Sequence, residues 1–431
     1  MRLSLRHISV TSVAVATTTA LALTTTPAAA APAPHGDGRW AASWGVSHKY
    51  PGAPAGWPPN WSSGGFADES VRQVLRVSSA GSQVRLRVSN RYGTQPLVVT
   101  GATVARSGEG PAVRPGTVRT LRFQGGRGLT VPTGRDAVSD PLALPVRPLE
   151  KLTVTLHFAA GGTGPVSYHP EGLTTSYRAA GDRTRDTSGQ PFAGEGSYAY
   201  YVISGVDVAG PRTAGTVVAF GDSITDGAGS TPGADNRYPD QLAERLTAAR
   251  SRLSVVNAGM SGNTLLSDSP CFGQKGIERF RHDVLDQPGV RTAVVLIGIN
   301  DIGAGGGPDF GCGLAPLVTA RDVINGHRTL IRLAKARGVK IVGATLTPFK
   351  GIEYEGYYSE AKNAVRKEVN HWIRTSGAYD AVADLDVALR DPADPDRLLP
   401  AYDSGDRIHP SDAGMDAMAR TVLPRVTGAD D

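Results

Sequence analysis

Ser223, Asn300, Asp406 and His409 are residue types that together could carry out nucleophilic chemistry on a carbonyl group. Ser223 follows the apolar run 217–220 and Gly221, so we expect a buried strand that ends in a tight turn and exposes the serine hydroxyl. A serine hydroxyl is a poor nucleophile until a base takes its proton and hydrogen-bond donors hold the oxyanion that forms. Taken alone, Ser223 is better explained as a residue that caps the next helix, which is a common role for serine.

Asp406 and His409 offer the base. They stand three residues apart in an Asp-x-x-His-Pro sequence near the end of the chain. His409 would take and return the proton, while Asp406 would accept the other ring N–H and fix the tautomer. The chain has nine histidines, and a single histidine is more often structural than catalytic. The case for His409 therefore depends on its neighbours.

Four short blocks occur in a fixed order: Gly221-Asp222-Ser223-Ile224-Thr225, 257–263 (Asn-Ala-Gly-Met-Ser-Gly-Asn), Gly298-Ile299-Asn300-Asp301 and Asp406-Arg407-Ile408-His409-Pro410. In this order they resemble the blocks of the SGNH (GDSL-type) hydrolase superfamily, over about residues 214–427. The resemblance implies a serine esterase with a Ser223, His409 and Asp406 triad. Its oxyanion donors would be the Ser223 amide, the Gly262 amide and the Asn300 side chain. Gly259 is a rival for the Gly262 role, and Asp222 and Asp301 are expected to brace their loops.

The elements that must position these residues follow from the change of hydrophobic period near residues 205–215. Beyond it, apolar runs alternate with helical stretches, which predicts an α/β domain with a parallel sheet and helices on both faces. The resemblance implies the flavodoxin-like three-layer αβα form. The ligand site of such a sheet lies at the carboxyl ends of the strands, where all four blocks fall. The expected strands are 216–220, 253–257, 292–297, 339–345 and 379–384, and the expected helices are 237–250, 275–286, 316–337, 358–375 and 411–424.

The region before this domain alternates with period two from about 70 to 208, as in Val84, Leu86 and Val88, with turn signals between the runs. This pattern predicts an all-β sandwich, jelly-roll-like, over residues 37–210, followed by the hydrolase domain over 214–427. Its start holds four of the five tryptophans, which could pack against the sandwich or form a platform for sugar rings. We favour packing. The four are Trp40, Trp44, Trp57 and Trp61.

Residues 1–31 show the charged start, apolar middle and small-residue end of a secretory signal peptide, so we expect a secreted, extracellular protein without stable membrane insertion. A net charge of +5 over 431 residues gives no reason to expect a nucleic-acid partner. The two cysteines, Cys271 and Cys312, would usually form a disulfide in an oxidising compartment, although two free thiols remain an alternative. Neither a phosphate-binding loop nor clustered metal ligands occur, so we expect no cofactor and no metal.

The sequence thus favours hydrolysis of carboxylic esters through an acyl-serine intermediate, with a small-molecule or polysaccharide ester as substrate. The sandwich and its tryptophans favour acylated carbohydrate. A lipase-like acylhydrolase that acts on lipid esters is the alternative within the same chemistry. A polysaccharide-binding protein without catalytic activity is the alternative from a different class, and acyl transfer to another alcohol would use the same residues. The oligomeric state is not indicated.

Overall fold

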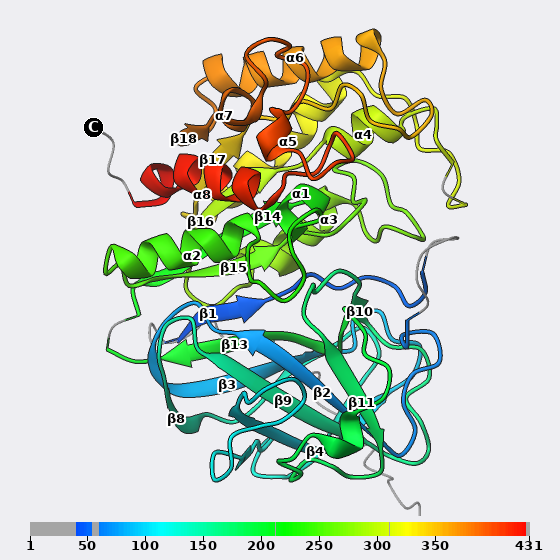
Figure 1. Ribbon diagram of the computed structural model, residues 1–431, viewed down its shortest axis with the longest axis vertical. Coiled ribbons are helices and arrows are strands. Elements are labelled where there is room, and N and C mark those ends of the chain that lie inside the picture. The colour runs from blue at the N-terminus through cyan, green and yellow to red at the C-terminus, as the bar shows by residue number, and fades with distance from the viewer. Residues whose placement is uncertain (1–39, 54–59, 212, 310, 428–431) are drawn as a thin grey trace, which may run out of the picture. The chain divides into compact units, whose positions relative to one another are not determined.

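The chain builds two kinds of sheet, antiparallel in its first half and parallel in its second (Figure 1). The computed structural model describes residues 40–53, 60–211, 213–309 and 311–427. The expected signal peptide and Trp57 lie outside the described residues. Residues 35–431 form one compact unit in which each kind of sheet has its own apolar core. None of the described helices is long and apolar enough to cross a membrane.

The first half is an antiparallel two-sheet structure, as the period-two pattern predicts. One sheet has the order β1-β13-β3-β7 with β8 also paired to β3, the other has the order β11-β2-β9-β4-β5 with β6 also paired to β4, and β10 pairs with β12. The strands are β1 (Trp40–Gly45), β2 (Glu69–Arg76), β3 (Gly81–Ser89), β4 (Leu97–Arg106), β5 (Arg119–Thr120), β6 (Leu129–Val131), β7 (Asp136–Val138), β8 (Leu142–Val146), β9 (Lys151–Phe158), β10 (Tyr168–His169), β11 (Ser176–Ala180), β12 (Tyr200–Tyr201) and β13 (Ile203–Ala209).

Alternating side chains of these strands fill the space between the two sheets. Val84, Leu86 and Val88 of β3 are buried, together with Leu152 and Leu156 of β9. Because every second side chain of a strand points to the same face, one face of each sheet supplies this core. The alternation of apolar and polar residues in the sequence therefore explains how the two sheets pack face to face.

The second half is a five-stranded parallel sheet with the order β15-β14-β16-β17-β18. This order is that of the flavodoxin-like fold, which confirms the predicted α/β class. All five predicted strands form, with small shifts at their ends. They are β14 (Gly215–Gly221), β15 (Leu253–Ala258), β16 (Val290–Leu296), β17 (Lys340–Ala344) and β18 (Ala381–Ala383).

The helices of this half form two groups, one in which α2 packs on α8 and one in which α5 packs on α3 and α6. Right-handed crossovers between parallel strands place helices on both faces of a sheet in this way. The helices are α1 (Ser223–Asp226), α2 (Tyr238–Ala248), α3 (Gly276–Phe280), α4 (Ile299–Ala304), α5 (Ala320–Lys335), α6 (Glu360–Thr375), α7 (Leu385–Leu389) and α8 (Asp412–Thr427).

Two helix predictions need correction. The helix expected over 316–337 begins only at Ala320, because Thr319 caps it and forms a reciprocal capping box with Asp322. The helix expected over 275–286 is α3 followed by a π-helical turn, Arg281–Leu285. The short helices α1, α4 and α7 are not predicted, because each is too brief to show a period of 3.6.

The first half covers the open edge of the parallel sheet, where β15 has a partner on one side only. The Ser78 hydroxyl donates to the Val255 carbonyl and accepts from the Val255 amide, both at 2.9 Å. Ala42 of β1 belongs to the core of the α/β half, and its amide donates to the Pro288 carbonyl at 2.9 Å. Exposed strand edges invite pairing with other chains, so these contacts also protect the sheet.

The described tryptophans of the first segment pack against protein, as expected. Trp44 is buried and meets the ring of Tyr200 edge to face. Trp61 stacks on Tyr201, with 5.1 Å between ring centroids. The Arg85 guanidinium lies over the ring of Trp40. These rings therefore serve the sandwich and its border with the α/β half.

Candidate active site

Ser223 is the first residue of α1, directly beyond the carboxyl end of β14. The Asp222 side chain caps this helix by accepting from the Ile224 amide at 3.1 Å. The first amides of a helix have no partner inside the helix, so the Ser223 N–H is free to face a ligand. Ser223 keeps 7% of its surface exposed, and its side chain lines a cavity.

His409 lies between Ser223 and Asp406. Its Nε2 is 2.8 Å from Ser223 Oγ, and its Nδ1 is 2.5 Å from Asp406 Oδ2. Asp406 also accepts from the amides of Ile408 and His409, at 3.1 and 2.8 Å. The three side chains predicted to act together are thus within hydrogen-bonding distance of one another, in the order hydroxyl, imidazole and carboxylate.

The loop before α8 holds this arrangement by an unusual backbone turn. Arg407 has a φ of 71°, in the left-handed region that non-glycine residues seldom adopt. The Asp403 carboxylate accepts from both the amide and the guanidinium of Arg407, at 3.0 and 2.8 Å. Asp403 therefore stabilises the turn that puts Asp406 and His409 on the same side.

The electrostatics of the pair favour a histidine that holds protons more tightly than usual. Burial lowers the pKa of His409, but the hydrogen bond and charge of Asp406 outweigh it, with help from Glu171 and Asp222, and raise this pKa above its ordinary value. For Asp406, burial opposes ionisation, yet His409 and two backbone amides lower the carboxyl pKa well below its usual range. Asp406 is therefore ionised and can orient the imidazole.

Asn300 is the second residue of α4, the short helix that follows β16. Its Nδ2 donates to the Asn263 carbonyl at 3.0 Å, and its Oδ1 accepts from the Tyr357 hydroxyl at 2.8 Å. An amide nitrogen has two hydrogens, so one remains for an oxyanion in the cavity that Asn300 lines. Tyr357, which the sequence analysis does not identify, fixes which way the amide faces.

Gly262 lines the same cavity, whereas the rival Gly259 does not. The Gly259 amide already donates to Asn257 Oδ1 at 2.9 Å, and a Cβ at this position would meet the backbone of Asp226. Gly262 has a φ of 73°, and a Cβ there would lie 2.1 Å from the ring of Phe272. The glycine is therefore required by the backbone and by Phe272, and not only by the approach of a substrate.

Asp222 and Asp301 brace loops, as predicted. The Asp301 carboxylate accepts from the amides of Leu265 and Leu266, at 2.7 and 2.9 Å. Burial raises the pKa of Asp222 and of Asp301 to about 7. Asp301 thus ties the end of β16 to the loop that follows Asn263.

Ser223, Asn300 and His409 line a cavity of about 300 Å³. The disulfide between Cys271 and Cys312 joins two loops at its border, which confirms the expected pairing. The loop with Cys271 follows Gly262, and the loop with Cys312 follows α4. The bridge therefore ties together the segments that carry two of the candidate oxyanion donors.

Several residues that shape the site lie outside the four sequence blocks and are not marked by any sequence pattern. Arg279 is fully buried, and its guanidinium donates to the carbonyls of Gly221 and Ala258, at 2.5 and 2.9 Å, which holds two strand ends together. His169 and Glu171 come from the sandwich half. His169 forms an ion pair with Asp226 at 3.0 Å, and Glu171 accepts from the Ser261 hydroxyl at 2.6 Å.

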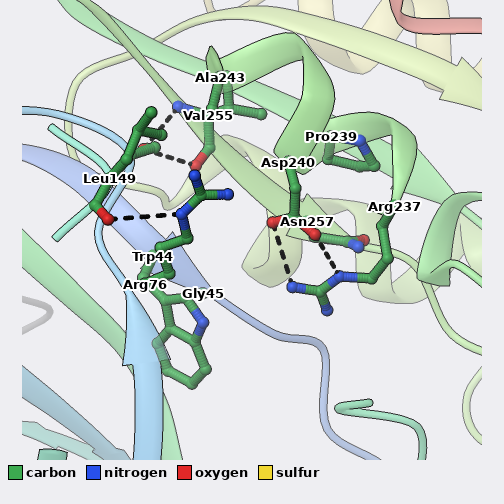
Figure 2. Close-up of a pocket in the computed structure, with 11 residues that line it drawn as sticks. Trp44, Gly45, Arg76, Leu149, Arg237, Pro239, Asp240, Ala243, Val255 and Asn257 are labelled. Carbon is green, nitrogen blue, oxygen red and sulfur yellow. Dashed lines mark hydrogen bonds and ion pairs between the residues drawn. The ribbon is translucent and has the colours of Figure 1, made fainter. Parts of the chain in front are cut away.

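A second, smaller cavity lies at the border of the two halves, between β2 and α2 (Figure 2). Its volume of about 20 Å³ suits a single water molecule and not an ester. Figure 2 shows the Arg76 guanidinium against the Leu149 carbonyl and Arg237 paired with Asp240, the latter at 2.6 Å. Arg76 also pairs with Glu244 of α2 at 2.7 Å, so this cavity belongs to the contact between the halves.

Among the described residues, no three His, Cys, Asp or Glu side chains are grouped so that they could hold a metal ion.

Comparison with known proteins supports the resemblance. Residues 219–417 match the family described as GDSL-like Lipase/Acylhydrolase. A search of curated proteins gave no match. Similar solved structures include a protein described as lipolytic and of the G-D-S-L family from Desulfitobacterium hafniense, with 22% identity, a TM-score of 0.36 and coverage of 48% of this chain and 97% of that one. An aryl esterase of M. smegmatis in inhibitor-bound form has 17% identity, a TM-score of 0.39 and coverage of 50% and 99%. The lipase/acylhydrolase of Enterococcus faecalis has 19% identity, a TM-score of 0.38 and coverage of 50% and 96%.

Proposed function

We propose that this chain, whose residues 219–417 form a domain of the GDSL-like lipase/acylhydrolase family, hydrolyses carboxylic esters through an acyl-serine intermediate at Ser223. The observation that carries the proposal is the line of three side chains, with 2.8 Å from Ser223 Oγ to His409 Nε2 and 2.5 Å from His409 Nδ1 to Asp406. This is the order in which a base activates a nucleophile and a carboxylate orients the base.

The first half-reaction forms the acyl-enzyme. Ser223 Oγ bonds to the ester carbonyl carbon while its proton moves to His409 Nε2. The carbonyl oxygen becomes an oxyanion, which the amides of Ser223 and Gly262 and the Asn300 side chain stabilise. When the tetrahedral intermediate collapses, the carbon–oxygen bond to the alcohol breaks, and His409 returns the proton to the leaving oxygen. In the second half-reaction water takes the place of the serine, and Ser223 regains its proton from His409.

The finer features follow from sequence and site together. An acylated carbohydrate is the substrate that we favour, because the lining of the cavity includes four hydroxyl side chains besides Ser223, those of Ser261, Thr264, Ser267 and Ser269. A lipase-like preference for long acyl chains is the second candidate, and the apolar residues of the 304–316 loop favour it. We also propose that the mature protein is extracellular, because a leader pattern precedes it and a disulfide suits an oxidising compartment.

Labelling with a fluorophosphonate probe tests the proposal, since such probes react with activated serines. The unaltered protein should be labelled and should cleave p-nitrophenyl acetate, whereas Ser223→Ala should do neither while its Tm stays within a few degrees. Ser188→Ala, which changes an exposed serine of the sandwich half, is the matched control and should behave like the unaltered protein. Labelling of Ser223→Ala would refute the assignment.

The chain-length preference separates the two substrate classes. Release of acetate from acetylated xylan and a preference for short p-nitrophenyl esters would support the carbohydrate ester. A preference for octanoate or longer esters would overturn it in favour of the lipid ester.

A further inference from the structure

Glu171 of the sandwich half reaches the catalytic cavity of the α/β half. It stands two residues after His169, the last residue of β10, whose ring is fixed on both sides. His169 Nδ1 is 2.9 Å from the Ser47 carbonyl, and its Nε2 is 3.0 Å from Asp226 Oδ1. Gly172, which follows Glu171 in the chain, packs against the ring of Tyr200. A Cβ at Gly172 would lie 2.5 Å from this ring. The position of Glu171 is therefore set by the fold on both of its flanks.

One carboxylate oxygen of Glu171 is engaged and the other is free to bind. Oε2 accepts from the Ser261 hydroxyl at 2.6 Å, while Oε1 has no partner among the described residues. Ser261 precedes Gly262, and its amide donates to Asp226 Oδ2 at 2.9 Å. The carboxylate thus lies beside the turn that carries a candidate oxyanion donor, with an acceptor left over at the cavity wall.

The lining of the cavity comes from segments of different character. Glu171 and hydroxyl side chains of the segment after Asn257, namely Ser261, Thr264, Ser267 and Ser269, are polar, although the same segment also supplies Phe272. The segment after α4 and the tyrosines near residue 355 supply mainly apolar surface, from Ala304, Pro308, Leu314, Pro316, Tyr354 and Tyr357. An ester whose acyl part is apolar and whose alcohol part is rich in hydroxyl groups would match both kinds of lining.

The charged groups of the cavity lining further limit which class of alcohol the substrate can contain. The described lining includes two carboxylates, those of Glu171 and Asp268, and neither lysine nor arginine. Lys49, whose charge acts on Glu171, does not line the cavity and donates to the Cys271 carbonyl. A carboxylate or phosphate on the substrate would therefore face like charge with no cationic side chain of the lining to bind it, which is unfavourable in a partly enclosed site.

Burial and the charge of Asp226 raise the pKa of Glu171, against the hydrogen bond from Ser261 and the charge of His409. In its ionised form Glu171 can accept from a neutral hydroxyl, and such hydrogen bonds to a charged acceptor are among the stronger ones.

We propose that Glu171 is a specificity-determining residue of the active site, which accepts a hydrogen bond from a hydroxyl group on the alcohol part of a sugar or polyol ester. This inference rests on the proposed ester hydrolysis and names the substrate class more closely. It also gives the sandwich half a function at the reaction centre, since Glu171 comes from that half and lines the cavity.

Three acetate esters test the inference: 6-O-acetylglucose, hexyl acetate and acetylcholine. The first two are acetates of primary alcohols and differ in whether the alcohol carries further hydroxyls. Glu171→Gln keeps an oxygen for Ser261 but removes the charge. We expect the ratio of kcat/KM for 6-O-acetylglucose to kcat/KM for hexyl acetate to fall roughly ten- to a hundredfold in this variant. Glu195→Gln, the same change at an exposed position of the sandwich half, should leave the ratio unchanged.

An unchanged ratio in Glu171→Gln would overturn the inference, and so would a selective loss on acetylcholine, which would assign Glu171 to a cationic alcohol. If the unaltered protein cleaved neither these three esters nor p-nitrophenyl esters of any chain length, the proposed ester hydrolysis itself would fail, which separates the two outcomes. A second measurement does not need the variant to fold. Methyl glucoside at millimolar concentration should inhibit hexyl acetate hydrolysis competitively in the unaltered protein, and absence of inhibition would contradict the inference.

Discussion

Two histidine–aspartate pairs lie near Ser223, and only one of them is arranged to act as a base. His409 and Asp406 are 2.5 Å apart, and His169 and Asp226 are 3.0 Å apart. The catalytic pair keeps 16% and 42% of its side-chain surface exposed, whereas the other pair keeps 2% and 1%. The chemical groups are the same, so the difference must come from what surrounds them.

The second ring nitrogen decides the role of each histidine. In His169 it faces the Ser47 carbonyl at 2.9 Å, which can only accept, while Nε2 lies at ion-pair distance, 3.0 Å, from Asp226 Oδ1. Burial lowers the pKa of His169, but the charge of Asp226 raises it above its ordinary value, which favours the doubly protonated ring. A doubly protonated ring cannot take another proton. In His409 the second nitrogen faces the Ser223 hydroxyl, which can donate, so a neutral ring is satisfied and can act as a base. A short distance to a carboxylate is therefore not enough to identify a catalytic histidine.

The first prediction separates the pairs by activity. His409→Gln removes the base, and we expect kcat/KM for p-nitrophenyl acetate to fall roughly 10⁴-fold or more, with little change in Tm. His169→Gln removes the cation beside Asp226, and its main effect should be a lower Tm. Kinetics and thermal melting of both variants check this. A His169→Gln variant that loses as much activity as His409→Gln, at a temperature where it is folded, would break the comparison.

The second prediction exchanges the carboxylates. Asp406→Asn should lower kcat by roughly 10³- to 10⁴-fold at neutral pH, because an amide cannot hold the imidazole in the tautomer that accepts the serine proton. Asp226→Asn should instead lower the free energy of unfolding by about 3–5 kcal/mol, because it leaves the His169 charge buried without a counter-charge. Urea unfolding measures the second effect. Equal stability of Asp226→Asn and the unaltered protein would show that His169 is neutral.

That His409 and Asp406 lie beside Ser223 could be predicted from the sequence, whereas the His169–Asp226 pair could not. Ser223, Asn300 and His409 each follow a strand or precede a helix in short blocks, and a parallel sheet brings the carboxyl ends of its strands together. The order of the blocks along the chain therefore already implies that they meet. Gly262 could be predicted from the same blocks, although Phe272, which explains its glycine, lies in a loop that no pattern marks.

His169 and Glu171 lie on and beyond a strand of two residues, which is too short to show a period. Their contacts with Asp226 and Ser261 depend on how the sandwich half meets the α/β half, and no local pattern encodes that contact. Arg279 is a similar case, since an arginine on a short helix indicates a solvated surface, whereas here it is fully buried against Phe220. Sequence patterns thus predict the elements and the motifs at their ends, but not the contacts between halves.

The third prediction concerns the oxyanion, whose negative charge is stabilised by hydrogen-bond donors other than His409 and Asp406. Asn300→Ala should lower kcat roughly 10²- to 10³-fold, because one donor to the oxyanion is lost. Asn370→Ala is the matched control, since Asn370 is also buried but bonds only the backbone of Leu346, at 2.7 Å, away from the cavity. It should lower stability and spare kcat. A loss of less than threefold in Asn300→Ala would remove Asn300 from the oxyanion site.

The last prediction uses a rise in pH, which should raise kcat/KM through His409 and lower the free energy of unfolding through His169. Asp406 raises the pKa of His409 against the effect of burial, so kcat/KM should rise with pH through a value above the ordinary 6.5 or so as the base becomes neutral. For His169, burial lowers the pKa but the charge of Asp226 raises it above the ordinary value. Between the ordinary and the raised pKa the folded state binds more protons than the unfolded state, so stability must fall as pH rises.

The size of this stability effect is at most about 1.4 kcal/mol per pH unit for one histidine, which makes it the smallest of the four. Urea unfolding from pH 6.5 upward should show a decline that His169→Gln reduces. His409→Gln is the control. The raised pKa of His409 also makes the free energy of unfolding fall as pH rises, and this variant measures that contribution so that it can be subtracted from the total decline. Buried Asp222 and Asp301, with pKa values of about 7, add a further decline that both variants share. If His169→Gln leaves the slope above pH 7 unchanged, the buried ring is not the cation that its two oxygen neighbours require.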